Sequence, residues 1–224
     1  MSALGRLGRR KDPRTAHAGI LARDFSGLAG PLVDGFYANF GYAAPLSLVL
    51  HVQALCDALQ PRLVVELGSG LTTRALVGAL GPEALVVSVD ESAAWLGRTA
   101  EGLPAGARVA LMATPGVAGL DYDALELLLA GLTPGLVIVD GPSQLPRFSA
   151  AAERLLVRLA SPGCAVVVDD TDRAANDEGA ARLAAACSLR KVDYGDPIYT
   201  GHRYSLLLPA GVQAPVAVAA APGT

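Results

Sequence analysis

The residues best suited to bind a ligand are the glycines and hydroxyl side chains that follow an apolar run at residues 63–67. Gly68 and Gly70 can turn the chain through a positive φ, and they leave backbone open where a Cβ would block a small molecule. We expect a helix over residues 71–80, whose N-terminal N–H groups and positive dipole end would face the same spot. This pattern favours an anionic or nucleotide-like ligand.

A carboxylate further along the chain strengthens this interpretation. Residues 85–90 form a second apolar run, which ends at Asp90 and is followed by Glu91. An acid at such a strand tip can accept hydrogen bonds from the two hydroxyls of a ribose. The glycine pattern lacks the third glycine of the dinucleotide fingerprint, because Thr73 stands there, and it lacks the Lys of a P-loop. A structural alternative is that the glycines only form a tight turn and that Asp90 caps the next helix.

Three more carboxylates follow later apolar runs. Asp140 ends the run at residues 135–140, and Asp169 and Asp170 end the run at residues 163–169. Because the tips of parallel strands face one crevice, we expect these carboxylates to converge beside the ligand. Such a cluster is unfavourable unless a cation compensates it, and its oxygen atoms select hard ions such as Mg²⁺. Alternatively, Asp140 begins a turn and Asp170 caps a helix and pairs with an arginine.

A few other side chains are candidates for a role in the site. His202, at the start of the last apolar run, could act as a general base, or it could be structural. Arg147 and Arg173 could steer an anionic substrate or lie solvated at helix ends. Trp95 could cover the edge of the ligand, although a place in the core is the interpretation we favour.

Length and composition indicate one α/β domain. The 224 residues are 52% hydrophobic and 17% charged, which suffices for a sizeable core. The formal net charge of −3 gives no basic groove for nucleic acid. No stretch has the length of a membrane span or the apolar block of a secretory signal. The isolated Cys56, Cys164 and Cys187 read as buried free thiols, so we expect a cytoplasmic protein that binds neither nucleic acid nor membrane.

The elements that must position these residues alternate regularly. Val-rich runs and Ala/Leu-rich stretches are typical of parallel strands joined by helices. The expected strands are 63–67, 85–90, 107–112, 135–140 and 163–169, and the expected helices are 45–60, 71–80, 92–101, 122–131, 145–160 and 174–187. The last two expected strands, 188–194 and 202–208, must be antiparallel, because their connection is too short for a parallel crossover.

The segment before the first helix has a different composition. Residues 15–42 mix glycine, proline and aromatic residues, which favours a mobile cover over the mouth of the sheet rather than a packed helix. We therefore divide the chain into an N-terminal arm and substrate-covering segment at 1–44, a ligand-binding domain at 45–209, and a flexible tail at 210–224. The apolar N-terminal segments could also form a homodimer contact.

Taken together, E-L-G-S-G after the first strand, an acid after the second and the final antiparallel pair resemble the class I S-adenosylmethionine-dependent methyltransferases. The resemblance covers about residues 45–208. It implies a Rossmann-like, doubly wound α/β fold with a seven-stranded, mostly parallel sheet that ends in a C-terminal antiparallel β-hairpin. The S-adenosylmethionine-binding residues that it implies are Glu66, Gly68, Ser69, Gly70, Thr72, Asp90, Glu91, Ala113 and Asp140. Ala113 and Thr114 stand where the family often has an acid, so the adenine contacts differ here.

The acidic tips are similar to those of cation-dependent O-methyltransferases of the catechol and sugar types. This similarity implies that Asp140, Asp169 and Asp170 hold Mg²⁺, which would bind two vicinal substrate oxygens and lower the pKa of the attacking hydroxyl. We expect Asp140 and His202 to be the catalytic residues, with His202 as the general base considered above. The implied function is methyl transfer from S-adenosylmethionine to a hydroxyl of a small molecule, an activity of the EC 2.1.1 class, with a nitrogen acceptor as an open alternative.

Two rival functions fit parts of the pattern. An NAD-dependent oxidoreductase would explain G-x-G and Asp90, but Thr73, the final hairpin and the lack of a Tyr-x-x-x-Lys pair argue against it. A non-catalytic nucleotide-binding partner subunit is the other alternative, because no general base stands out.

Overall fold

The computed structural model describes residues 13–116, 119–142 and 147–216. In this part of the chain, seven strands form one sheet in the order β3-β2-β1-β6-β7-β9-β8. Their bounds are β1 (Leu63–Leu67), β2 (Leu85–Asp90), β3 (Val109–Ala113), β6 (Leu136–Val139), β7 (Ala165–Val168), β8 (Arg190–Gly195) and β9 (Arg203–Leu208). The pairs β3–β2, β2–β1, β1–β6 and β6–β7 are parallel, and β9 is antiparallel to both β7 and β8. The predicted fold class is confirmed.

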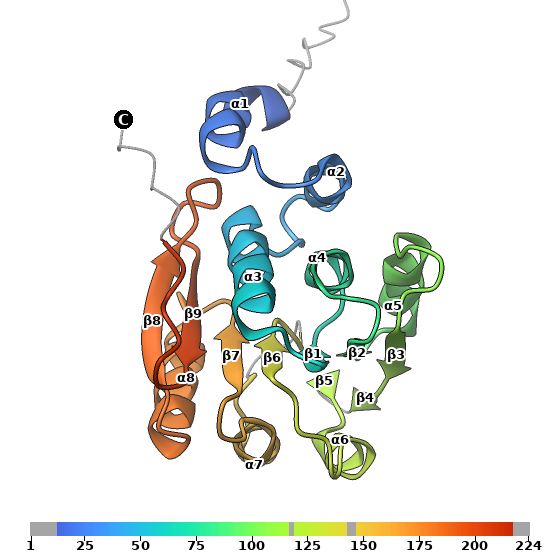
Figure 1. Cartoon of the computed structure of the whole chain (residues 1–224), viewed down its shortest axis with the longest axis vertical. Coiled ribbons are helices and arrows are strands. Elements are labelled where there is room, and N and C mark those ends of the chain that lie inside the picture. Colours follow the sequence, from blue (N-terminus) through green and yellow to red (C-terminus); the bar gives the residue numbers. More distant parts are fainter. Residues whose placement is uncertain (1–12, 117–118, 143–146, 217–224) are drawn as a thin grey trace, which may run out of the picture.

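Helices cover both faces of the sheet (Figure 1). One face carries α3 (Leu46–Leu59), α4 (Leu71–Ala79) and α5 (Ala93–Glu101), and the other carries α6 (Tyr122–Leu128), α7 (Ala150–Leu159) and α8 (Ala174–Ala186). Successive strand residues point to opposite faces, so that Val64 packs with α3 residues and Val65 with α7 residues. Burial of both faces explains why the strands read as continuous apolar runs.

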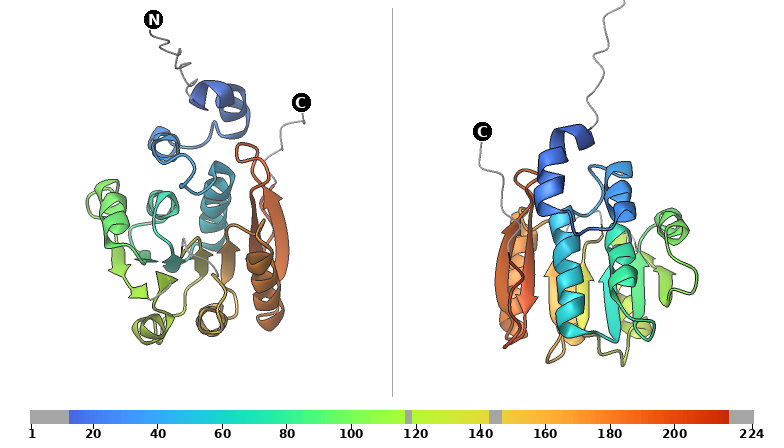
Figure 2. Two further views of the ribbon diagram at one scale, coloured as in Figure 1. Left: turned by 180° about the vertical axis from the view of Figure 1, so that it is seen from behind. Right: turned by 45° about the horizontal axis from the view of Figure 1, so that its top comes forward.

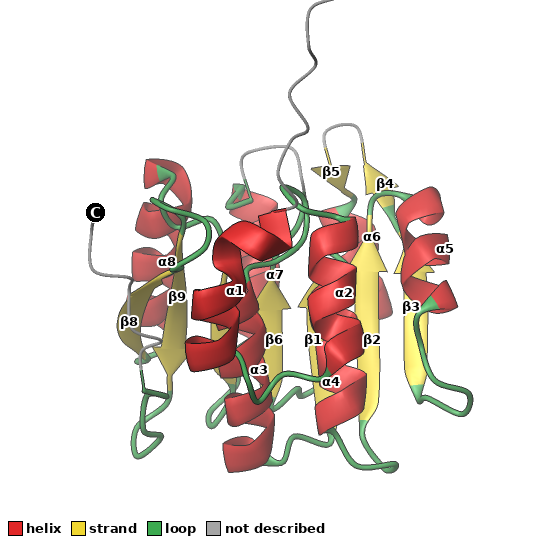
Figure 3. Cartoon of the chain, turned by 90° about the horizontal axis from the view of Figure 1, so that it is seen from above, coloured by secondary structure: helices red, strands yellow, loops and turns green. Residues whose placement is uncertain are grey.

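The N-terminal segment differs from the expected mobile cover. It forms two helices, α1 (Pro13–Asp24) and α2 (Gly30–Ala38), which lie on the side of α3 and α4 away from the sheet (Figures 1 and 3). The prediction that this stretch lacks a packed helix is wrong because Phe25 and Phe36 are buried, only 2% and 0% exposed, against residues of α3 and α4. No residue of α1 is buried.

The remaining features of the fold are a second small sheet and the two ends of the described chain. A two-stranded antiparallel sheet, β4 (Pro115–Gly116) with β5 (Gly119–Leu120), follows β3 and was not expected. Figure 2 shows both termini of the described chain on the side of α1, away from α6 and α7. Most of the predicted tail, from residue 217 onward, lies outside the described residues. Among the described helices, none combines the length and hydropathy that a membrane crossing requires.

Candidate functional site

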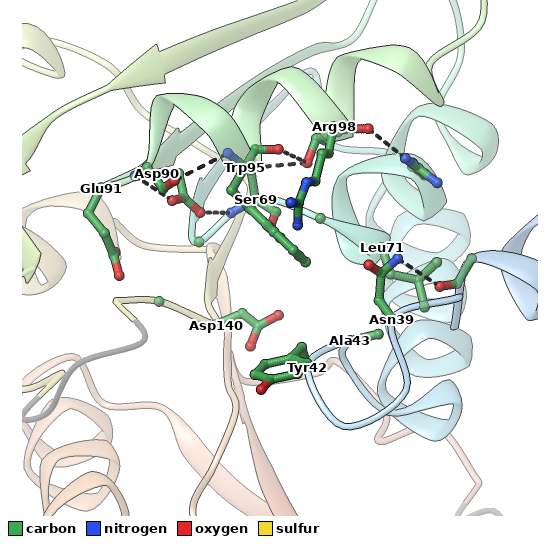
Figure 4. A pocket seen from close by; sticks show the side chains of 17 residues that line it. Asn39, Tyr42, Ala43, Ser69, Leu71, Asp90, Glu91, Trp95, Arg98 and Asp140 are labelled. Atoms are coloured by element: carbon green, nitrogen blue, oxygen red, sulfur yellow. Dashed lines mark hydrogen bonds between the residues drawn. The ribbon is translucent and has the colours of Figure 1, made fainter. Parts of the chain in front are cut away.

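A cavity of about 350 Å³ lies at the carboxyl ends of β1, β2 and β6 (Figure 4). Six of the nine residues predicted to bind the cofactor line it, namely Gly68, Ser69, Gly70, Asp90, Glu91 and Asp140. The other lining residues come from α2, the loop after it, α4, α5 with its N-cap Ser92, and Gly141 after β6. The carboxyl ends of β1, β2 and β6, where the sequence predicted a ligand, therefore surround one cavity.

Asp90 fastens the loop after β1 to the tip of β2. Its Oδ2 accepts a hydrogen bond from the backbone N–H of Ser69 at 3.0 Å, and its Oδ1 accepts one from Ser92 at 2.8 Å. Burial raises the pKa of Asp90, and these two N–H donors oppose that rise. Each carboxylate oxygen has two lone pairs, so the group can still accept a hydroxyl from the cavity.

Glu66 supports the same loop from below and does not line the cavity. Its Oε2 accepts from the hydroxyls of Thr73 at 2.5 Å and Ser88 at 2.6 Å. The Thr73 hydroxyl in turn accepts the N–H of Gly70 at 2.9 Å, so the carboxyl group fixes the loop through one intermediary. Complete burial raises the pKa of Glu66 to about 7. Glu66 thus shapes the site without reaching it.

Gly68 and Gly141 bring two loops into direct backbone contact. Gly68 has φ of +95°, and a Cβ placed on it would lie 2.4 Å from the backbone N of Gly141. This approach sets the Asp140 loop against the glycine loop. The glycine at position 68 is therefore required by the neighbouring backbone as well as by the turn.

Trp95 and Tyr42 also line the cavity, although neither is among the nine predicted cofactor-binding residues. Trp95 is partly exposed, lines the cavity and donates its indole N–H to the carbonyl oxygen of Ser69, which corrects the favoured placement in the core. The guanidinium of Arg98 lies 5.6 Å from the centre of its ring. Tyr42, 88% exposed, reaches the opposite side of the cavity beside Asp140 (Figure 4). In the sequence, the position of Tyr42 directly after Gly41, in a segment rich in aromatic residues, was the feature that could have indicated a role in the cavity.

The remaining predicted cofactor residues lie away from the hollow. Ala113 is exposed at the end of β3, and Thr72 is fully buried in the first turn of α4; neither lines the cavity. Thr114 is buried, and its N–H donates to the carbonyl oxygen of Asp90.

The three later carboxylates do converge, but they meet basic side chains. Arg147 is buried, only 4% exposed, and one of its Nη atoms lies 2.6 Å from Asp170 Oδ2 while the other lies 3.8 Å from Asp140 Oδ1. His202 Nε2 lies 2.8 Å from Asp169 Oδ1. The alternative in which Arg147 is a solvated helix-end residue is therefore wrong.

These contacts set the protonation tendencies of the cluster. Burial, together with the charge of Asp169, holds the pKa of Asp140 well above its usual range. Burial alone would lower the pKa of His202, but the hydrogen bond and charge of Asp169 raise it. His202 Nδ1 also lies 3.6 Å from Asp170 Oδ1, so both ring nitrogens face carboxylates. This surrounding suits an imidazolium better than a free base.

We tested whether these residues fit a divalent cation. In the described chain, Asp169, Asp170 and His202 have potential ligand atoms within 4.8 Å of one another, and Asp140 is not part of that group. The oxygen donors are of the type that Mg²⁺ prefers. However, the Asp170 carboxylate already accepts the buried Arg147 guanidinium, and Asp169 is already bonded to His202. The arrangement does not fit a metal ion while these pairs persist.

Several solved structures have a fold similar to that of this chain. The O-methyltransferase TomG from Streptomyces achromogenes, involved in tomaymycin synthesis and solved with S-adenosylmethionine (SAM), is 20% identical, with 83% of this chain and 94% of that chain covered and a TM-score of 0.58. An O-methyltransferase from Bacillus cereus, in complex with S-adenosylhomocysteine (SAH), is 14% identical, with 86% and 97% covered and a TM-score of 0.66. The SAH-bound methyltransferase PaMTH1 from Podospora anserina is 14% identical, with 93% and 99% covered and a TM-score of 0.65.

These likenesses show that the chain has the fold of SAM-dependent O-methyltransferases over most of its length. No sequence-family model matches the chain, and no curated protein matches it.

Proposed function

We propose that this chain is a SAM-dependent methyltransferase that methylates a hydroxyl of a small molecule. The observation that carries the proposal is the cavity at the tips of β1, β2 and β6, where the glycine loop, Asp90 and Asp140 surround one hollow. The fold shared with O-methyltransferases solved with SAM or SAH supports it. The finer assignment of roles to individual residues belongs to the same proposal.

The residues around the cavity divide the binding task. Asp90 accepts hydrogen bonds from the ribose hydroxyls, and the bare backbone of Gly68 and Gly70 lets the methionine part lie close to the loop. The indole of Trp95 offers a flat apolar surface along one side. When bound, SAM supplies a methyl group on a sulfonium that is already a good leaving group. The protein therefore acts mainly by alignment of the acceptor oxygen.

Asp140 is the carboxylate of the acidic cluster that lines the cavity, which makes it the group within reach of the acceptor. It accepts the proton that the acceptor hydroxyl loses as oxygen bonds to the methyl carbon and the carbon–sulfur bond breaks. His202 does not line the cavity, and it acts on Asp140 only through Asp169. We therefore assign His202 a positioning role and not that of the base.

The predicted boundaries at residues 44 and 209, a homodimer, cytoplasmic location and the absence of nucleic-acid binding all await experiment. The comparisons give no support to an NAD-dependent oxidoreductase.

The proposal can be tested with the single tryptophan as the reporter. Because Trp95 lines the cavity, SAH should change its fluorescence and raise the Tm, whereas NAD should do neither. Asp90→Ala should weaken SAH binding by about tenfold or more. The exposed Asp123→Ala on α6 is the matched control and should bind like the wild type. A response to NAD instead of SAH, or unchanged affinity in Asp90→Ala, would reject this function.

A further inference from the structure

We propose that the buried guanidinium of Arg147 takes the place of a divalent cation between the tips of β6 and β7, so that the enzyme works without a bound metal. The inference rests on the methyl transfer proposed above. It concerns the source of the positive charge beside Asp140, where the acceptor hydroxyl would lie.

Arg147 is held from two strand tips. One Nη atom donates to Asp170 after β7 at 2.6 Å, and the other donates to the carbonyl oxygen of Val139, the last residue of β6, at 3.4 Å. The same Nη lies 3.8 Å from Asp140. With only 4% of its side chain exposed, the guanidinium is fixed in place and cannot swing out as a surface arginine does. It bridges the same two tips that a metal would bridge.

The contacts of Arg147 conflict with a metal at this position. Mg²⁺ requires oxygen ligands at about 2.1 Å in near-octahedral geometry. The Asp170 oxygen that would serve it already holds a charge-assisted hydrogen bond to Arg147. A second positive centre beside the guanidinium would be repelled in a buried environment, where charges are poorly screened.

The other carboxylates of the cluster also have basic partners on the protein. Asp169 is bonded to His202 at 2.8 Å, and Asp170 also pairs with Arg173 at 3.2 Å. Three carboxylates thus face three basic side chains. A buried acidic cluster without such partners would need an external cation, and this one has internal ones.

Through these contacts Arg147 is a positioning residue. It joins the loop that carries Asp140 to the tip of β7, and Asp140 is the member of the cluster that lines the cavity. The positive charge of Arg147 therefore stays beside Asp140 and stabilises the negative charge there. Unlike a bound metal ion, it cannot dissociate from the site.

Mn²⁺ binding, followed by the loss of the free-ion signal in electron paramagnetic resonance, tests the inference on the full chain. We expect the wild type to leave the Mn²⁺ signal unchanged at ion concentrations well above that of the protein. Arg147→Gln should take up Mn²⁺, because it removes the buried positive charge between Asp140 and Asp170 while it preserves much of the side chain's shape. Arg182→Gln, which breaks an exposed pair with Glu153, is the matched control and should take up none. A purely structural role for Arg147 would not create an ion site.

Uptake of one Mn²⁺ per wild-type chain that is lost in Asp169→Asn would overturn the inference, and so would a folded Arg147→Gln that takes up no Mn²⁺. If circular dichroism shows that Arg147→Gln does not fold, the wild type and Arg147→Lys decide the matter, since both retain the positive charge and should exclude the ion. SAH binding is measured on the same samples by Trp95 fluorescence. Absence of SAH binding rejects the methyltransferase, whereas SAH binding with wild-type Mn²⁺ uptake rejects only the role of Arg147.

Discussion

At the scale of single residues, Glu66 predicts how the stability of the protein depends on pH. Its pKa in the folded protein is about 7, above the ordinary value of 4.5, because burial disfavours the charged form. A group with a raised folded pKa contributes its full stability below the unfolded pKa, and that contribution is lost as pH rises through the folded pKa. The loss therefore falls between pH 4.5 and about 7.

Glu66→Gln should remove this loss. Relative to the wild type, the variant should gain on the order of 3 kcal/mol in free energy of unfolding between pH 4.5 and pH 8. Urea unfolding of both proteins over that pH series measures the difference. The exposed Glu101→Gln on α5 serves as the control. Parallel stability curves for Glu66→Gln and wild type would contradict the assignment.

Gly68 offers a second prediction at a single residue. In Gly68→Ala the new methyl carbon would lie 2.4 Å from the backbone N of Gly141 at a φ of +95°, so one of the two loops must move. We expect a loss of about 3 kcal/mol in unfolding free energy together with weaker SAH binding. Gly78→Ala in α4, where a Cβ meets open space, should instead stabilise by about 0.5–1 kcal/mol. Equal effects of the two substitutions would show that the loops do not constrain each other.

At the scale of elements, Asp196 links the β8–β9 connection to the start of α3. Its carboxylate accepts from the Ser47 hydroxyl at 2.5 Å and from the backbone N–H groups of Ile198 at 2.8 Å and Tyr199 at 2.6 Å. The Tyr199 hydroxyl then accepts the N–H of Gly41, in the loop that lines the cavity mouth.

Asp196→Ala should lower the free energy of unfolding by about 3 kcal/mol, because it leaves several buried donors without an acceptor. SAH should also bind more weakly, because the loop at residues 39–43 loses its anchor. Chemical unfolding and Trp95 fluorescence measure the two effects. The exposed Asp57→Ala on α3 should change neither. If Asp57→Ala is as damaging, general loss of charge and not the lost hydrogen bonds is responsible.

The strands and most helices could be predicted because apolar runs buried on both sheet faces leave a local mark in the sequence. The packing of α2 could also have been predicted, since Leu32 and Phe36 stand at helical spacing, but the glycines and aromatics of the segment obscured it. The basic partners of Asp169 and Asp170 could not be predicted. Arg147 reaches Asp170 and His202 reaches Asp169 across separations of 23 and 33 residues, and no local pattern encodes such pairs.

At the scale of the whole molecule, the two N-terminal helices should differ in importance. None of the residues of α1 is buried, and its ion pair between Arg14 and Asp34 is largely exposed. Among the described residues, removal of residues 1–24 takes away only the partly buried Ile20 and Leu21 from the core and should therefore reduce the free energy of unfolding by about 1–2 kcal/mol. Removal of residues 1–38 takes away buried Phe25 and Phe36 and should reduce it by several times as much, about 5 kcal/mol. Calorimetry of both truncated chains compares them, and similar Tm values would refute the distinction.

The position of β9 has a consequence for synthesis on the ribosome. The described residues that line the cavity lie between Gly35 and Gly141, whereas β9 is the last strand of the described chain and inserts between β7 and β8. A nascent chain that has not yet released residues 203–208 leaves one edge of β7 open to other strands. The synthesis of β9 is therefore the step that closes this edge of the sheet and protects the newborn protein from aggregation.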